Sequence, residues 1–379
     1  MADLTSAEKF FASVPDEEIV LDDDVIAALR SRCRGKTVVF AGTHAAERFR
    51  AADLPVWCGV EAEPVMATVE RMAEFLKKES PDTVVAAGGG SVLDAAKAAL
   101  LMHETDWPLE NLFGMNRWSD AHPGKTLKRL IAIPTTSGTG SEATPYSNIV
   151  SPAAGVKKLI VEKAAVPACA ILSPQLTASM PPALTRATGC DALAHLIEGF
   201  LNIGADGNHP DANRWAKCGI ALVAEQLPAA MRGDGEARRA MAYAALLGGM
   251  TIRFKSTGLP HLCSFSWYGR IAHGDAVAVL LPACWRYYLG NPAVAARTME
   301  LAEIFPGDTP EAVIASYEKF LDAVGMPGGL SAWNGIDADL IERTAQSGAE
   351  NPMKLELAPR PVPLAESYEI LKAILKLSL

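Results

Sequence analysis

The sequence has no run of eighteen apolar residues, no C-x-x-C pair and no excess of basic charge. A membrane-spanning helix needs about 20 apolar residues, so we expect no membrane partner. The net charge of −9 at pH 7 disfavours a nucleic-acid partner, because phosphate backbones bind basic surfaces. The seven cysteines are scattered, and we interpret them as reduced thiols of a cytoplasmic protein.

The chain also lacks the marks of a disordered, repetitive or exported protein. Of its 379 residues, 49% are hydrophobic and 21% are charged, which is typical of a globular protein with a sizeable core. The first residues, MADLTSAEKFF, have neither the basic start nor the long apolar stretch of a signal peptide. We find no internal repeat, and the length predicts about two or three domains.

The first half of the chain alternates short apolar runs with amphipathic stretches. We expect helices over residues 65–80 and 91–103, and strands over residues 36–42, 54–60, 82–90 and 127–136, with two more inside 157–174. This alternation predicts a parallel sheet covered by helices on both faces.

The character of the sequence changes after MPPALT, residues 180–185. Strand-like runs largely vanish, and Ala/Leu-rich stretches predict helices over residues 186–203, 212–231, 236–252, 275–289, 292–304 and 310–324. Four prolines between 352 and 363 predict an extended segment before a last helix. We therefore expect an α/β domain over residues 1–180 and a helical domain over residues 181–379.

A glycine turn, GGGSVLDAAK at residues 88–97, follows a predicted strand and opens a predicted helix. Glycines allow close backbone approach, and the N–H groups of a helix start suit a pyrophosphate. Ser91 could cap the helix or donate to a phosphate. A plain tight turn is the alternative, and the stretch is not the G-x-G-x-x-G pattern of a generic Rossmann fold.

A second polar turn, PTTSGTGSEAT at residues 134–144, also follows a predicted strand. Loops at the carboxyl ends of parallel strands line the ligand crevice of such sheets. A solvated Ser/Thr loop is the alternative for either turn alone. Together, two such loops predict a nucleotide site.

A carboxylate and an imidazole interrupt the apolar stretch GCDALAHLIEGF, residues 189–200. Asp191 and His195 are four residues apart, so they project from nearly the same side of a helix. For this pair alone, a mutual hydrogen bond in the core is the favoured interpretation. His261 and His273 also lie among apolar residues. One carboxylate and three imidazoles can bind a divalent transition metal, and composition does not choose between Fe, Zn, Mn and Co.

These stretches, together with MPPALTRATGCDALAHLIEGF and GLPH…AHGDAVAVLLP, resemble the iron-containing (group III) alcohol dehydrogenases. They occur in the family's order, and the likeness extends from about residue 20 to the end. The resemblance implies an N-terminal dinucleotide-binding α/β domain and an all-helical C-terminal domain, with the active site in the cleft between them. It also implies a homodimer, and a relation in fold to glycerol dehydrogenase and dehydroquinate synthase.

The resemblance assigns roles to individual positions. It implies Fe(II), or else Zn²⁺, bound by Asp191, His195, His261 and His273. It implies a phosphate loop of Gly88, Gly89, Gly90 and Ser91, and further cofactor contacts from Asp94 (nearer the nicotinamide), Thr135, Thr136, Thr139 and Lys158. Lys157 is the alternative to Lys158, because the spacing is loose there.

Two positions depart from the family pattern. Phe265 occupies the place of a further histidine, so water or a hydroxyl such as that of Tyr268 is expected to serve the proton path. Gly42 occupies the place of an aspartate that binds the ribose of NAD. Since Gly42 leaves room for a 2′-phosphate to which Thr43 and His44 could donate, we predict NADP(H) over NAD(H). The alternative is that Gly42 is only a turn residue.

The resemblance implies reversible hydride transfer between NAD(P)H and a small aldehyde or ketone, with the metal as Lewis acid. Residues 251–273 contain Arg253, Lys255 and Arg270 but no acid. Lys255 and Arg270 are therefore candidate contacts to an anionic aldehyde, and phosphonoacetaldehyde and succinic semialdehyde reductases occur in the family. Alternatively, these cations face solvent. A glycerol dehydrogenase-like enzyme and a catalytically silent relative are the competing functions.

Overall fold

The computed structural model describes residues 4–12, 17–105 and 107–379, and the chain forms two compact units. The α/β unit is Lys9–Met180, and the helical unit is Pro181–Leu379 together with residues 4–8. The sequence predicts that residues 4–8 belong to the α/β domain. They belong to the helical unit, where the Tyr243 hydroxyl donates to the Glu8 carboxylate at 2.9 Å. A contact so distant in sequence leaves no local pattern.

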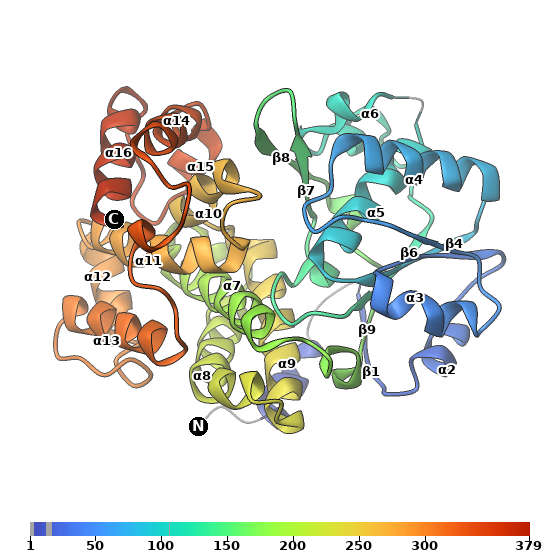
Figure 1. Cartoon of the computed structure of the whole chain (residues 1–379), viewed down its shortest axis with the longest axis horizontal. Helices are drawn as coiled ribbons and strands as arrows, with labels where there is room; N and C mark the ends of the chain where they lie inside the picture. Colours follow the sequence, from blue (N-terminus) through green and yellow to red (C-terminus); the bar gives the residue numbers. More distant parts are fainter. Residues whose placement is uncertain (1–3, 13–16, 106) are drawn as a thin grey trace. The chain divides into compact units, whose positions relative to one another are not determined.

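The α/β unit is built on a six-stranded parallel sheet, which confirms the predicted fold class (Figure 1). The spatial order of its strands is β1-β9-β6-β4-β2-β3. Their bounds are β1 (Glu18–Leu21), β2 (Thr37–Ala41), β3 (Val56–Cys58), β4 (Thr83–Gly88), β6 (Arg129–Pro134) and β9 (Cys169–Leu172). The helices of this unit are α2 (Val25–Arg30), α3 (Thr43–Arg50), α4 (Met66–Glu79), α5 (Gly90–His103) and α6 (Arg117–Ala121), and α1 (Leu4–Phe11) crosses the boundary between the units.

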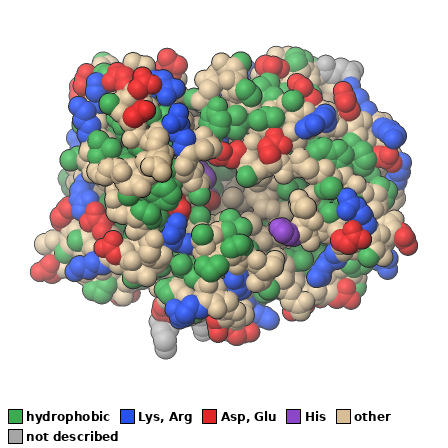
Figure 2. Space-filling view, viewed as in Figure 1, with side chains coloured by type: hydrophobic (Ala, Val, Ile, Leu, Met, Phe, Trp, Pro, Cys, Tyr) green, Lys and Arg blue, Asp and Glu red, His purple; other side chains and the backbone are tan. Residues whose placement is uncertain are grey.

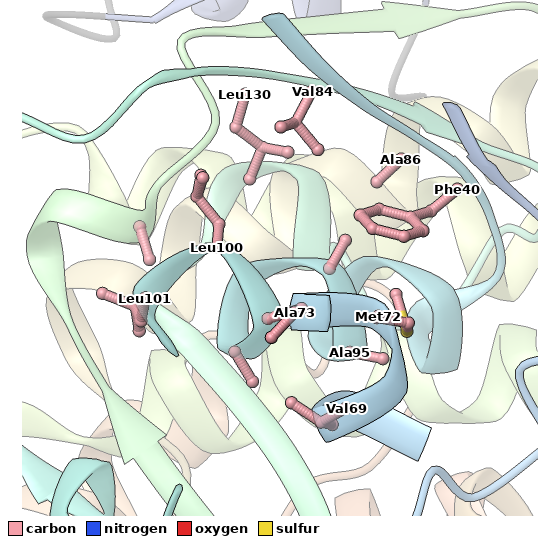
Figure 3. Close-up of a cluster of buried hydrophobic side chains, with 14 of the residues drawn as sticks. Phe40, Val69, Met72, Ala73, Val84, Ala86, Ala95, Leu100, Leu101 and Leu130 are labelled. Atoms are coloured by element: carbon pink, nitrogen blue, oxygen red, sulfur yellow. The ribbon is translucent and has the colours of Figure 1, made fainter. Parts of the chain in front are cut away.

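Both faces of this sheet are covered, which explains why its central strands are apolar along their whole length. Every residue of β2 and β4 is buried. One face packs on α4 and α5, as Figure 3 shows for Phe40, Met72 and Leu100. The other face packs on α2 and α3, which contribute Leu29 and Phe49. Burial on both sides is the usual environment of parallel strands.

A second, three-stranded sheet of order β5-β8-β7 departs from the prediction. It consists of β5 (Gly114–Met115), β7 (Tyr146–Ser151) and β8 (Val156–Val161), and β7 pairs antiparallel with β8. The sequence predicted β8 as one more strand but did not predict β1, β5 or β7. These strands are short or partly polar, so they lack the apolar signal of a buried strand.

The helical unit follows the predicted Ala/Leu-rich stretches closely, with ends that shift by a few residues. Its helices are α7 (Pro182–Leu201), α8 (Ala212–Met231), α9 (Gly235–Lys255), α10 (Leu259–Ser264), α11 (His273–Tyr288), α12 (Pro292–Met299), α13 (Pro310–Ala323), α14 (Ala338–Ala349), α15 (Pro352–Glu356) and α16 (Ser367–Leu377). The segment expected to be extended, residues 352–363, begins instead with α15. Pro352 is compatible with that helix because it occupies the first turn, which needs no N–H donor.

Helix α7 is the central helix of this unit. Every residue from Gly189 to Leu201 is buried, and α8, α9 and α11 pack around it. A helix that is apolar on all sides is expected in such a position. The charged side chains within this stretch are therefore buried as well, whereas Arg186, near the start of α7, is only partly buried.

Surface charge, helix character and cysteine state bear on the exclusions that were drawn from the sequence. Figure 2 shows acidic and basic side chains interspersed over the visible face. Within the described ranges, no helix combines the length and the apolar character that crossing a membrane requires. All seven cysteines are free thiols.

Candidate metal and cofactor sites

Helix α7 presents three ionisable side chains on one face. Asp191, His195 and Glu198 are separated by four and then three residues, and each is at most 5% exposed. A spacing of three or four residues aligns side chains along a helix. The sequence predicted roles for Asp191 and His195 but not for Glu198, although the position of Glu198 in the same helical register was a signal.

Two further histidines come from α10 and α11. His261 lies in α10 and His273 is the first residue of α11. Gly274 permits the close approach of α11 to α7, because a Cβ at this position would overlap the carbonyl oxygen of Ala187. This packing brings His273 to Asp191.

The three imidazoles converge on one carboxylate oxygen. Asp191 Oδ1 lies 3.8 Å from Nε2 of His195, 3.6 Å from Nε2 of His261 and 3.7 Å from Nε2 of His273. These separations exceed hydrogen-bonding distance, so the mutual Asp191–His195 hydrogen bond considered from the sequence is not formed. Among the described side chains, Asp191 Oδ1 and His261 Nε2 are buried without a hydrogen-bond partner.

Charge within the cluster favours an ionised carboxylate. Burial opposes ionisation of Asp191, but the imidazoles of His195, His273 and His261 hold its pKa well below the usual range. For His261, burial lowers the pKa, but Glu198 and Asp191 outweigh burial and raise it to about 9. The pocket therefore favours positive charge beside Asp191, whether on a ring or on a bound cation.

Hydrogen bonds fix which ring nitrogen faces the centre. His261 Nδ1 lies 2.5 Å from Glu198 Oε1, and Glu198 Oε2 accepts from the Gly258 N–H at 2.6 Å. The Ser264 hydroxyl donates to the His261 carbonyl, which leaves its oxygen to accept from His273 Nδ1 at 3.3 Å. Each Nδ1 can thus carry the proton while Nε2 presents its lone pair.

This donor set fits a divalent metal ion. Candidate ligand atoms of Asp191, His195 and His261 all lie within 4.8 Å of one another, and His273 lies against the same carboxylate oxygen. One oxygen and several imidazole nitrogens suit Fe, Zn or a similar transition metal. A carboxylate behind a ligating histidine, as Glu198 is here, is the usual outer support of such sites.

In the α/β unit, the glycine turn after β4 and the polar turn after β6 lie against each other. Gly89 caps α5 and Gly90 is its first residue. A Cβ at Gly89 would lie 3.2 Å from the Thr136 side chain, and one at Gly90 would overlap Thr139. The α5 N-terminus therefore offers backbone N–H groups beside threonine side chains, an arrangement suited to a phosphate. The Ser91 hydroxyl donates within the unit, to the Ala62 carbonyl.

Beneath these loops lies a buried polar network. Asp94 accepts from the Ser141 hydroxyl at 2.6 Å and from the Asn148 N–H at 2.9 Å. Lys97 Nζ lies 2.6–3.3 Å from five oxygens of Ser141, Thr144 and Tyr146. One oxygen of Asp94 is thus engaged by the loop that follows β6, and the other is engaged by β7. Lys97 was not predicted from the sequence, although an Asp and a Lys three residues apart in an apolar helix were a signal.

The turn after β2 lies beside the glycine turn. The Gly42 N–H donates to the Ala87 carbonyl at 2.8 Å, and Thr43 and His44 are exposed at the start of α3. Gly42 has φ −65°, and a Cβ there would make only ordinary contacts, the nearest at 3.7 Å with Gly88. The backbone therefore does not require glycine at this position.

The two lysines of β8 differ in their partners. Lys157 is ion-paired with Glu63 at 2.8 Å. The Lys158 ammonium lies over the Phe113 ring, 5.5 Å from its centroid. Adjacent residues of a strand point to opposite faces, so only one of them can face a given ligand, and Lys158 is the one without an acidic partner among the ion pairs of the described chain.

The candidate substrate cations have structural partners. Lys255 is 1% exposed and ion-paired with Asp206, and its Nζ also donates to Asn213 at 3.1 Å. Lys255 is therefore not part of the substrate site that we propose. Arg270 is exposed and donates to the Gly335 carbonyl at 2.6 Å, and the Arg253 guanidinium lies over the Phe254 ring. Phe265 is partly buried at the end of α10.

Comparisons with known proteins agree with this geometry. The model of the iron-containing alcohol dehydrogenases matches residues 34–174, and the model of the Fe-containing alcohol dehydrogenase family, C-terminal, matches residues 185–375. An alcohol dehydrogenase of Thermococcus barophilus is 32% identical over 278 residues, which cover 73% of this chain and 72% of that protein.

Solved structures give the same result. The iron-containing alcohol dehydrogenase of Thermococcus thioreducens superposes with a TM-score of 0.82 at 27% identity, over 95% of this chain and 98% of that one. Sulfoacetaldehyde reductase from Bifidobacterium kashiwanohense, in complex with NAD⁺, superposes with a TM-score of 0.80 at 25% identity, over 96% and 97%. Both halves of the chain match family models, and the predicted resemblance is confirmed: this chain belongs to the iron-containing alcohol dehydrogenase family of oxidoreductases.

Proposed function

We propose that this protein is a metal-dependent, NAD(P)H-linked reductase that interconverts a small aldehyde and its primary alcohol. The observation that carries the proposal is the convergence of three imidazoles on the buried carboxylate of Asp191. When bound, a divalent metal would supply Lewis acidity toward a carbonyl oxygen, and NAD(P)H would supply the hydride.

The chain's own groups would bind and orient these components. Asp191, His195, His261 and His273 would ligate the metal, with Glu198 fixing the His261 ring. Gly88, Gly89 and Gly90 would receive the cofactor's phosphates at the start of α5, beside Thr135, Thr136 and Thr139. We also assign Ser91, Asp94 and Lys158 to the cofactor site. The bonds of Ser91 and Asp94 within the unit favour a supporting role for both.

Phe265 occupies the position at which the family pattern has a further histidine, and its side chain has no donor atom. The proton that accompanies hydride transfer would therefore come from water or from the Tyr268 hydroxyl. Replacing Phe265 with His would supply an imidazole and change the pH dependence of kcat. An unchanged pH profile would argue against a proton path at this position.

We further propose that the aldehyde is anionic and that Arg270 contributes to its binding. The supporting observations are an exposed Arg270 guanidinium in a segment without acids and the similarity to a sulfoacetaldehyde reductase. Arg270→Ala should raise KM for an anionic aldehyde and leave KM for a neutral aldehyde of similar size unchanged. Equal effects on both would contradict the assignment.

For the dinucleotide we propose a preference for NADP(H). Gly42, Thr43 and His44 leave room and donors for a 2′-phosphate, and the backbone at Gly42 does not itself demand glycine. Gly42→Asp should therefore fold normally and move preference toward NADH. Efficient use of NADH by the unaltered protein would refute this preference.

The decisive assay combines the purified protein, Fe²⁺ or Zn²⁺, NADPH and a panel of aldehydes. Metal-dependent oxidation of NADPH with any aldehyde supports the proposal. A preference for glycerol and NAD⁺ would favour the glycerol dehydrogenase-like alternative, and metal binding without turnover would favour a silent relative. We propose a cytoplasmic homodimer as the working assembly, which sedimentation would test.

A further inference from the structure

Besides Lys255, the helical unit contains another buried lysine, on α15. Lys354 is 3% exposed, and its ammonium donates to Thr257 Oγ1 at 2.6 Å, to the Thr257 carbonyl at 3.1 Å and to Ser256 Oγ at 3.4 Å. An ammonium has three N–H donors, so these oxygens can satisfy it fully. Burial lowers the pKa of Lys354 to about 8, and Glu198 opposes this shift. At neutral pH the side chain therefore remains mostly charged.

Lys354 forms hydrogen bonds to Ser256 and Thr257 in the connection between α9 and α10, Ser256–Gly258. Ser256 has φ 64° and ψ 161°, a conformation that is strained for a residue other than glycine. Such strain persists only where surrounding contacts impose it. Here the contacts come from the Lys354 side chain, which reaches both Ser256 and Thr257.

The same connection carries a hydrogen bond to the candidate metal centre. Gly258 N–H donates to Glu198 Oε2 at 2.6 Å, while Glu198 Oε1 contacts His261 Nδ1. The next residue, Leu259, donates its N–H to the Tyr288 hydroxyl at 2.8 Å. The orientation of Glu198, and through it of the His261 ring, therefore depends on where Gly258 lies.

We propose that Lys354 is a positioning residue for the metal centre: it fixes the Ser256–Gly258 connection so that Glu198 holds His261 with Nε2 toward Asp191. This inference rests on the proposed function, because it takes these residues to bind a metal. It adds a residue from α15, 81 positions beyond His273, which is the nearest ligand in the chain.

Two other roles for Lys354 predict different results. If Lys354 only stabilised the fold, its loss would lower the melting temperature without a specific loss of metal affinity. If its charge acted directly on the metal, removing that charge would strengthen cation binding, because like charges repel. Positioning alone predicts weaker binding when either partner of the Lys354–Thr257 contact is lost.

The test measures Zn²⁺ affinity of the full chain by competition with a chelating dye, and thermal stability in the metal-free state. Lys354→Met should weaken Zn²⁺ binding about 10- to 100-fold, as is usual when an outer support of a metal site is lost. Thr257→Val removes the hydroxyl without changing charge and should weaken binding in the same direction by a smaller factor. Thr257→Ser keeps the hydroxyl and should bind Zn²⁺ about as tightly as the unaltered protein.

Lys97→Met is the matched control, because Lys97 is likewise a buried lysine but lies in the α/β unit. It should lower the melting temperature and leave Zn²⁺ affinity unchanged. If Lys354→Met does not fold, the two Thr257 variants decide. If the unaltered protein fails to bind Zn²⁺, the proposed function fails. Two results would overturn only the positioning role, provided that the unaltered protein binds Zn²⁺. In the first, Lys354→Met and Thr257→Val bind Zn²⁺ as tightly as the unaltered protein or more tightly. In the second, Lys97→Met binds Zn²⁺ as weakly as Lys354→Met.

Discussion

The α/β unit and the helical unit each contain a buried lysine that donates to the oxygens of a connecting segment, but Lys97 and Lys354 support regions of different construction. Lys97 bonds the segment Ser141–Tyr146, which follows β6 and is less than 50 positions away. Lys354 bonds Thr257, 97 positions away. The loops that we propose for the cofactor are short continuous stretches, each at the end of a strand. The metal centre that we propose draws its residues from α7, α10 and α11. The proposed sites therefore differ in origin, one local in the chain and the other non-local.

Because the two proposed sites are built from different parts of the chain, we expect a single substitution to change ligand binding at one site and not at the other. A change in the helical unit should affect metal affinity and leave dinucleotide binding intact, and the reverse should hold in the α/β unit. Asp191→Asn, Gly274→Ala and Gly90→Ala test that separation, and Lys97→Met tests the charge of the buried lysine in the α/β unit.

Asp191→Asn should have the largest effect. Asparagine keeps the size of the side chain but removes the charge on which three imidazoles converge. We expect kcat/KM to fall about a thousandfold, equivalent to about 4 kcal/mol, with little change in the Kd of NADPH measured by fluorescence. Asp322→Asn, at an exposed position of α13, is the control and should behave as the unaltered protein. A normal turnover rate in Asp191→Asn would end the metal-centred proposal.

Gly274→Ala should displace α11 from α7. The added methyl would overlap the Ala187 carbonyl, so the backbone must move and carry His273 away from Asp191. We expect a loss of about 1–3 kcal/mol in unfolding free energy, which is the usual cost of overpacking, and at least a tenfold loss of Zn²⁺ affinity. Gly207→Ala is the control, because a Cβ at Gly207 meets no atom within 4 Å. Equal effects of the two substitutions would contradict the packing argument.

Gly90→Ala tests the local site in the same way. The nearest atom to the new Cβ is the Thr139 methyl carbon, so the substitution should push apart the two cofactor loops. We expect the Kd of NADPH to rise about tenfold, or about 1.4 kcal/mol, while Zn²⁺ affinity stays unchanged. The double variant Gly90→Ala/Thr139→Ser removes that methyl group and should recover part of the affinity. No recovery would show that the loss is not steric.

Lys97→Met should change how stability depends on pH. Burial lowers the pKa of Lys97 from 10.5 to about 8, so between pH 8 and 10.5 the unfolded state binds more protons than the folded state. This group therefore makes the unaltered protein more stable, relative to the variant, as pH rises through that window, by about 1–3 kcal/mol. Denaturant unfolding of both proteins at pH 7.5, 9 and 10.5 would measure the difference. A difference that stays constant with pH would contradict the assignment of this shift to Lys97.

Much of this organisation was predictable from the sequence, for a physical reason in each case. Strands β2, β4 and β6 are buried on both faces, so their apolar runs predicted them directly. Asp191 and His195 stand out because charged groups are costly inside an apolar helix. The short strands β1, β5 and β7 and the placement of β8 in a separate sheet were not predictable, since they depend on neighbours distant in the chain.

The supporting residues were the hardest to predict. Glu198, Lys97 and Lys354 are buried charges whose hydrogen-bond partners lie 44 to 98 positions away in the chain. Lys255 was predicted as a candidate contact to the substrate, but its side chain is ion-paired with Asp206. A lysine in an apolar stretch indicates that some oxygen must meet it, but the sequence does not name that oxygen.

The amino-acid sequence by itself determined the alternating α/β half, the helical half and the residue types that can bind a phosphate and a metal, because periodicity and turn chemistry act between neighbours in the chain. Only the tertiary structure decided that His261 and His273 meet Asp191, and that Glu198 and Lys354 stand behind them. Those contacts depend on how closely helices pack, at Gly274 above all, and packing distances are a property of the folded chain.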